Sequence, residues 1–119
     1  MSGKTAKRKG SGFEREIAKY LNEKLGINSY RTPLSGAISN LRADLMGTPD
    51  LHVECKRTEK FQIYAALEQA EKAREKDTLV TVINRRNKMT TGESLVVMRL
   101  DEWLELYRGY LQHKGLKCD

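Results

Sequence analysis

Hydrophobic residues recur every three or four positions in three stretches of the chain. Side chains at that spacing share one face of a helix, so the pattern predicts helices over residues 13–25, 61–76 and 101–113. The third helix is expected to begin with Asp101 as its N-cap. Its apolar stripe should face inward, onto the core or onto a second copy of the chain, and comprises Trp103, Leu104, Tyr107 and Leu111.

Shorter apolar runs between these helices have the length and the β-branched residues of strands. They cover residues 28–32, 43–46, 51–57, 79–83 and 94–100. The run LVTVI at 79–83 is almost wholly apolar, which predicts a central strand covered on both faces. The resulting order α-β-β-β-α-β-β-α predicts an α/β fold with a central mixed β-sheet flanked by helices.

A turn between the second and third predicted strands decides which side chains meet across the hairpin. If residues 48–50 (TPD) form a three-residue turn, Asp44 lies directly opposite Glu54. Their Cβ atoms are then ~5 Å apart, and Lys56 shares the strand face of Glu54. Asp50 is the rival carboxylate, but it lies four residues from Glu54 along one strand, about 13 Å away.

The chemistry of this cluster depends on its members acting together. An acidic residue two positions before a lysine is common, because 16 acidic residues and 12 lysines in 119 give about 1.6 such triplets by chance. Asp44 and Glu54 with a backbone carbonyl, such as that of Cys55, form a partial shell suited to Mg²⁺. Lys56 can orient an attacking water and stabilise charge on the phosphorus. The cluster predicts a metal-dependent nuclease site.

Composition narrows the class of protein further. A chain of 119 residues forms a single domain, and its net charge of +6 favours a nucleic-acid partner. No apolar run reaches the ~20 residues of a membrane span, and the two cysteines and two histidines form no zinc-binding pattern. Both cysteines are expected to be reduced, in the cytoplasm. The basic, glycine-containing residues 1–12 predict a flexible arm before a nuclease domain over 13–119.

Four segments carry a more specific pattern. They are RKGSGFEREIAKYL at 8–21, YRTPLSGA at 30–37, ADLMG at 43–47 and HVECK at 52–56. Together they resemble the archaeal-type Holliday junction resolvases of the PD-(D/E)xK nuclease superfamily, which has relatives in phages. The resemblance implies a restriction-endonuclease-like core and an endonuclease of DNA recombination and repair that resolves four-way junctions.

The same resemblance implies roles for individual residues. Asp44 and Glu54 would ligate the metal, Mg²⁺ or its substitute Mn²⁺, and Lys56 would act beside them. Glu14 would add a carboxylate near a second metal position, and Ser35 would lie near the scissile bond. Phosphate contacts near the cleavage site are implied for Arg15 and Arg31.

A four-way junction needs two symmetric cuts, whereas one chain of this size offers one site. A homodimer with two-fold symmetry supplies both sites and matches the symmetry of the junction. We expect DNA phosphates to contact basic residues of the arm and of the loops that follow the strands. These residues are Lys7, Arg8, Lys9, Arg57, Lys60, Arg85, Arg86 and Lys88.

The sequence leaves several interpretations open. Gln69 belongs either to the site or to the surface of the second helix, and His52 is predicted to be a surface or structural residue. Another PD-(D/E)xK nuclease, such as a nickase, a restriction-type enzyme or an exonuclease, would share the same site residues. A basic DNA-binding module without catalytic activity is the third alternative.

Overall fold

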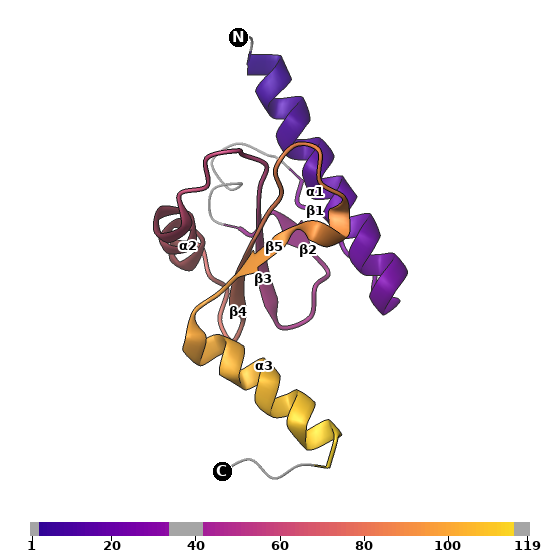
Figure 1. Ribbon diagram of the computed structural model, residues 1–119, viewed down its shortest axis with the longest axis vertical. Coiled ribbons are helices and arrows are strands. Elements are labelled where there is room, and N and C mark those ends of the chain that lie inside the picture. The colour runs from indigo at the N-terminus through magenta and orange to yellow at the C-terminus, as the bar shows by residue number, and fades with distance from the viewer. Residues whose placement is uncertain (1–2, 34–41, 116–119) are drawn as a thin grey trace.

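The computed structural model describes residues 3–33 and 42–115, with the backbone alone described over 3–11. Figure 1 shows the elements in chain order. They are α1 (Gly3–Leu25), β1 (Tyr30–Arg31), β2 (Leu45–Met46), β3 (Leu51–Lys56), α2 (Ile63–Lys72), β4 (Leu79–Asn84), the 3-10 helix η2 (Thr91–Glu93), β5 (Leu95–Val97) and α3 (Leu100–His113).

The strands form one five-stranded sheet in the order β1-β2-β3-β4-β5. Strands β3 and β4 are parallel and are joined through α2, and the other three pairings are antiparallel. The predicted α/β class with a mixed sheet is therefore confirmed. Strand β4 is buried from Val80 to Asn84, as its apolar sequence predicts for a central strand.

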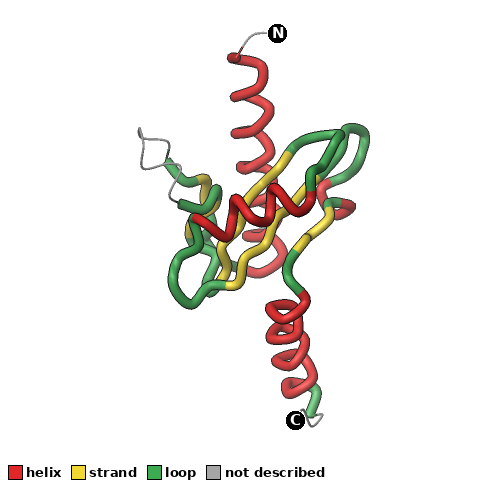
Figure 2. The backbone as a smooth tube through the Cα atoms, turned by 90° about the vertical axis from the view of Figure 1, so that its left-hand side faces the viewer, coloured by secondary structure: helices red, strands yellow, loops and turns green. Residues whose placement is uncertain are grey.

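Two helices cover opposite faces of this sheet (Figure 2). On one face, Phe13, Ile17 and Ala18 of α1 pack against Leu45, Val53 and Ile83. On the other face, Ala66, Leu67 and Ala70 of α2 pack against Val80 and Val82. Alternate residues of a strand point to opposite faces, so the odd-numbered residues of β3 face α1 and the even-numbered ones face α2.

The turn between β2 and β3 has the predicted register. Leu45 pairs with Val53, which is the pairing expected for a three-residue turn at 48–50. Gly47 precedes this turn with a φ of 77°, and a Cβ there would clash with the carbonyl oxygen of Asn28. The turn therefore needs glycine, and it sets the alignment on which the position of Asp44 depends.

Four features of the helices differ from the predictions. Helix α2 (Ile63–Lys72) is shorter at both ends than the predicted helix over 61–76. Helix α1 begins at Gly3, ten residues before its predicted start, so residues 3–12 continue the same helix. The N-cap of α3 is Arg99, and Asp101 lies in the first turn. The α3 stripe does not face the core, because no residue of α3 is buried, and its predicted alternative, a contact with a second copy of the chain, stays a prediction.

The division into an arm over 1–12 and a domain over 13–119 stays a prediction. In the described part of the chain, no helix has the length and apolar character needed to cross a membrane.

Candidate active site

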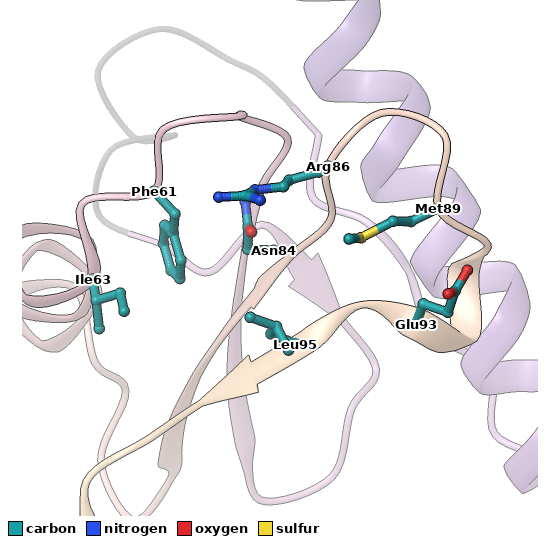
Figure 3. A pocket seen from close by; sticks show the side chains of 7 residues that line it. All are labelled: Phe61, Ile63, Asn84, Arg86, Met89, Glu93 and Leu95. Atoms are coloured by element: carbon teal, nitrogen blue, oxygen red, sulfur yellow. The ribbon is translucent and has the colours of Figure 1, made fainter.

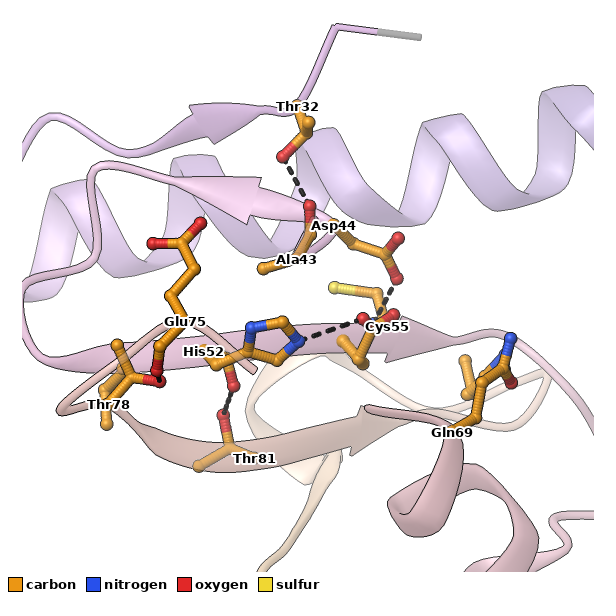
Figure 4. Close-up of polar contacts among 12 residues, drawn as sticks. Thr32, Ala43, Asp44, His52, Cys55, Gln69, Glu75, Thr78 and Thr81 are labelled. Atoms are coloured by element: carbon orange, nitrogen blue, oxygen red, sulfur yellow. Dashed lines mark hydrogen bonds and ion pairs between the residues drawn. The ribbon is translucent and has the colours of Figure 1, made fainter. Parts of the chain in front are cut away.

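The centre of the site lies where the start of β2 meets the end of β3 (Figure 4). The backbone N–H of Asp44 donates to the carbonyl oxygen of Val53 at 2.9 Å. The side chain of Asp44 turns back to β3, where its Oδ2 accepts a hydrogen bond from the backbone N–H of Cys55 at 2.7 Å. The hydroxyl of Thr32 donates a hydrogen bond to the carbonyl oxygen of Ala43, the residue before Asp44, at 2.6 Å.

Asp44 and Glu54 form a closely coupled pair of carboxyl groups. Burial, the negative charge of Glu54 and a hydrogen bond with Glu54 raise the pKa of Asp44 to about 8. The N–H of Cys55 opposes this shift but does not cancel it. Near neutral pH the pair therefore retains one proton, since two adjacent buried carboxylates repel each other when both are ionised. A bound cation would relieve the same repulsion.

His52 supports Glu54 from the neighbouring position on the same strand face. Its ring is fully buried, and Nε2 lies 3.2 Å from Oε1 of Glu54. The carbonyl oxygen of His52 accepts a hydrogen bond from the hydroxyl of Thr81 at 3.3 Å. The parity of β3 places His52 and Glu54 on one face, but only the packing shows that His52 is buried beside the site.

Lys56 follows on the same face, two residues beyond Glu54. Its Nζ donates to Oε1 of Gln69 on α2 at 3.2 Å. Gln69 therefore touches a proposed catalytic side chain, which favours the first of its two sequence-based interpretations. A hollow of about 210 Å³ opens here between β3 and α2, and its lining includes Lys56, Lys60 and Gln69.

Glu14 approaches the carboxyl pair from α1. Its Oε2 accepts a hydrogen bond from Nε of Arg31 at 2.8 Å. Burial raises the pKa of Glu14, Arg31 opposes that shift, and the charge of Glu54 adds to it. Glu14 and Glu54 are therefore within electrostatic reach of each other. Arg15 is exposed on the neighbouring position of α1.

Comparison with known families identifies the kind of enzyme that carries this arrangement. Residues 5–102 match the model of the family described as "Phage putative PDDEXK endonuclease". The chain belongs to this family. The match covers the carboxyl pair, Lys56 and all five strands. No curated protein and no solved structure matches the chain.

A PDDEXK endonuclease is typically served by a divalent metal, and the donor types here fit such an ion. Asp44 and Glu54 supply hard carboxylate oxygens, and their shared proton marks a position where positive charge is favoured. Among residues 3–33 and 42–115, no three His, Cys, Asp or Glu side chains converge as a ready-made metal cage. Mg²⁺ commonly binds through one or two carboxylates and keeps several waters, so two suffice.

The basic residues predicted to contact DNA differ in their surroundings. Lys60, Arg86 and Lys88 are exposed on the loops that follow β3 and β4. These loops leave the same edge of the sheet, because β3 and β4 are parallel and Lys56 pairs with Asn84. Arg57 is half-buried, with its Nη1 lacking a hydrogen-bond partner. Ser35 lies outside the described residues, as do the side chains of Lys7, Arg8 and Lys9.

Arg85 has a structural contact that the sequence did not predict. Its guanidinium forms two hydrogen bonds with the carboxylate of Glu16 on α1, at 2.9 and 2.7 Å. It also donates to the carbonyl oxygen of Met89 at 2.9 Å and lies over the ring of Phe13. Arg85 thus ties the loop after β4 to α1, and its guanidinium is engaged in that contact.

A larger cavity of about 340 Å³ lies beside the site and contains neither carboxyl group (Figure 3). Its walls are mainly apolar, and Phe61, Met89 and Leu95 are among them. Asn84 connects this cavity to the active strand, because its side-chain amide donates to the carbonyl oxygens of Lys56 and Thr58. Asn84 therefore holds the end of β3 and the start of the loop that follows it.

Proposed function

We propose that the protein is a Mg²⁺-dependent endonuclease that resolves four-way DNA junctions as a homodimer, with Mn²⁺ as a substitute ion. The observation that carries the proposal is the half-buried pair Asp44–Glu54, which holds a proton near neutral pH and whose Glu54 lies two residues before Lys56. Such a pair is costly in a structural role, because burial of two like charges destabilises the fold. It is useful where a cation binds.

In this proposal each residue of the cluster has a distinct task. Asp44 and Glu54 would hold the ion, with the backbone carbonyl of Cys55 as a third donor. The ion would polarise a phosphate oxygen and lower the pKa of a bound water. The N–H of Cys55 orients Asp44, and His52 orients Glu54.

Lys56 supplies a positive charge at the reacting phosphate in addition to that of the metal ion. Its hydrogen bond to Gln69 fixes the direction of the ammonium group. A fixed charge stabilises the transition state more than the ground state, because negative charge on the phosphate oxygens increases during attack. Lys56 is therefore assigned to catalysis rather than to simple DNA affinity.

The preference for branched DNA is supported by charge and by the resemblance of residues 8–57 to junction resolvases. The chain carries a net charge of +6, and exposed basic side chains follow both β3 and β4 at one edge of the sheet. Contacts from such residues to phosphates position DNA without reading its sequence. Recognition by shape, rather than by base sequence, is the expected outcome.

A cleavage assay on three substrates tests this function. Labelled four-way, Y-shaped and linear DNA of matched sequence are incubated with the protein in Mg²⁺ or in chelator. We expect paired cuts in the four-way junction, in Mg²⁺ alone. Asp44→Asn should abolish cutting and retain junction binding, whereas Asp50→Asn, on the exposed turn, should cut normally.

Each other outcome selects a different function. Equal cutting of linear and four-way DNA would identify a general nuclease. Binding in chelator without cutting in Mg²⁺ or Mn²⁺ would identify a DNA-binding module. Normal cutting by Asp44→Asn would remove Asp44 from the site.

A further inference from the structure

The last helix presents its apolar side to solvent. All of its large apolar residues except Leu106 lie at helical spacing and form one continuous stripe, here named the α3 face: Leu100, Trp103, Leu104, Tyr107, Tyr110 and Leu111. Trp103 is 44% exposed, Tyr107 43% and Leu100 68%. A helix of a soluble protein normally turns such a stripe toward the core. Here the stripe has no cover within the described part of the chain.

The orientation of α3 is fixed by contacts on its polar side. Arg99, at the start of the helix, forms two hydrogen bonds with Glu71 of α2, at 3.0 and 2.9 Å. Glu102 accepts a hydrogen bond from the backbone N–H of Val80 at 2.8 Å and pairs with Arg74. These contacts turn the polar side of α3 toward the sheet, and the helix projects from the body of the protein (Figure 1).

The size of the α3 face is that of a protein interface. The aromatic rings stack along it, with centroids 5.1 Å apart for Trp103 and Tyr107 and 6.3 Å apart for Tyr107 and Tyr110. From their exposed fractions, the side chains of the face leave roughly 600 Å² accessible. That area is at the lower end of what one partner contributes to a stable interface, which is roughly 600 to 1,000 Å².

We propose that the α3 face is the surface on which a second copy of this chain docks, with the two α3 helices antiparallel. The charges of α3 favour that partner and that orientation. The first half of the helix carries Asp101 and Glu105, and its end carries Arg108, His113 and Lys114. An antiparallel pair brings the acidic half of one copy beside the basic end of the other and opposes the helix dipoles. Two-fold symmetry closes this contact, since each copy offers the same surface.

Nucleic acid is a less suitable occupant of the same aromatic row. Stacked aromatic side chains bind unpaired bases where basic residues accompany them. The first half of the α3 face is bordered by the carboxylates of Asp101 and Glu105, which would repel phosphates, and Lys114, over the ring of Tyr110, accompanies only the end of the face. An apolar, two-fold contact between copies fits both the rings and their borders.

This inference deepens the proposed function, on which the link to paired cutting rests. Each copy carries one carboxyl pair, so the α3 contact would join two sites in one particle. Helix α3 contacts α2 and the start of β4 through its polar side, and its apolar face turns away from the sheet that carries Asp44 and Glu54. Loss of the contact should therefore leave each site able to cut one strand.

Sedimentation in chelator, without DNA, measures the contact independently of nuclease activity. We expect the wild-type protein at tens of micromolar to sediment at twice the 13.6 kDa mass of the chain. Tyr107→Glu should raise the dimer dissociation constant at least tenfold, because it places a charge at the centre of the face. Tyr64→Glu makes the same change at a 71% exposed position of α2 and should sediment as wild type.

A monomeric wild-type protein, or a dimer unchanged by Tyr107→Glu, would overturn the proposal. So would weaker binding of single-stranded DNA by Tyr107→Glu with an unaltered dimer. Far-UV circular dichroism checks that the variant folds, and Tyr107→Ser replaces it if it does not. An active wild-type enzyme that is monomeric would reject the interface and leave the nuclease assignment intact.

Discussion

The carboxyl pair predicts an unusual dependence of stability on pH in the metal-free protein. The pKa of Asp44 is about 8 in the folded chain, against an ordinary value of 3.8. A raised carboxyl pKa stabilises the folded state at low pH, where the proton is present in both states. That stabilisation is lost as pH rises from about 4 toward 8, because the unfolded chain releases the proton first.

The size of the effect follows from the same shift. Between pH 6 and pH 8 the unfolded chain has lost the proton of Asp44, whereas the folded chain still retains much of it. Each pH unit in that window costs about 1.4 kcal/mol of unfolding free energy, falling off near the folded pKa, so the total loss is about 2 kcal/mol. For a domain of this size, that loss lowers the melting temperature by roughly 8 °C.

Urea denaturation of wild type and Asp44→Asn, in chelator at pH 6 and pH 8, measures this term. Far-UV circular dichroism is the suitable probe, because the single tryptophan lies on the exposed α3 face. Asn cannot lose a proton, so its unfolding free energy should change about 2 kcal/mol less than that of wild type between the two pH values.

Asp50→Asn provides the matched control for this experiment. It removes an aspartate on the exposed turn and should retain the wild-type dependence on pH. Equal pH dependence of wild type and Asp44→Asn would refute the idea that the buried pair shares a proton. Saturating Mg²⁺ should also flatten the wild-type curve, because the ion replaces that proton.

Three further predictions concern neighbouring residues. His52→Leu should raise the Mg²⁺ concentration for half-maximal cleavage by about tenfold. His52→Gln keeps an N–H donor and should raise that concentration much less. Equal effects of the two substitutions would show that His52 serves only packing. Lys56→Ala should lower the single-turnover rate by about 10²-fold and retain DNA affinity. Lys60→Ala should weaken DNA affinity and retain the single-turnover rate. The same pattern of changes in both variants would contradict the catalytic assignment of Lys56. Arg85→Ala should lower the unfolding free energy by roughly 2 kcal/mol and leave the salt dependence of DNA binding unchanged. Arg86→Ala should instead flatten the slope of log affinity against log salt concentration by about 0.9. A flatter slope for Arg85→Ala would show that Arg85 contacts DNA.

Local sequence determined the strand that carries the site. Alternation along residues 51–56 places Glu54 and Lys56 on one face, and this parity is a property of extended backbone that neighbours do not alter. The length of the turn at 48–50 sets the pairing of Leu45 with Val53, and that pairing brings Asp44 opposite Glu54. These relations involve residues close in the chain, so the sequence was sufficient to predict them.

Helix boundaries and polar partnerships depended on contacts that the sequence does not show. Glu16 and Arg85 are 69 positions apart, and Lys56 and Gln69 are joined across two elements. Charged and polar residues spaced as in this sequence could form many different pairs. Only the packing of α1 and α2 on the sheet determines which of these pairs form. The burial of His52 is likewise a result of α2 lying over the even-numbered face of β3.

The orientation of α3 and the pKa of Asp44 were decided by tertiary structure alone. The apolar stripe of α3 is visible in the sequence, but Arg99 and Glu102 turn it away from the sheet by binding Glu71, Arg74 and the backbone of Val80. The proton held by Asp44 depends on the loss of water around two carboxyl groups. Desolvation and the direction of a helix face are set by the surrounding atoms in three dimensions, whereas periodicity along the chain reports only which residues share a face.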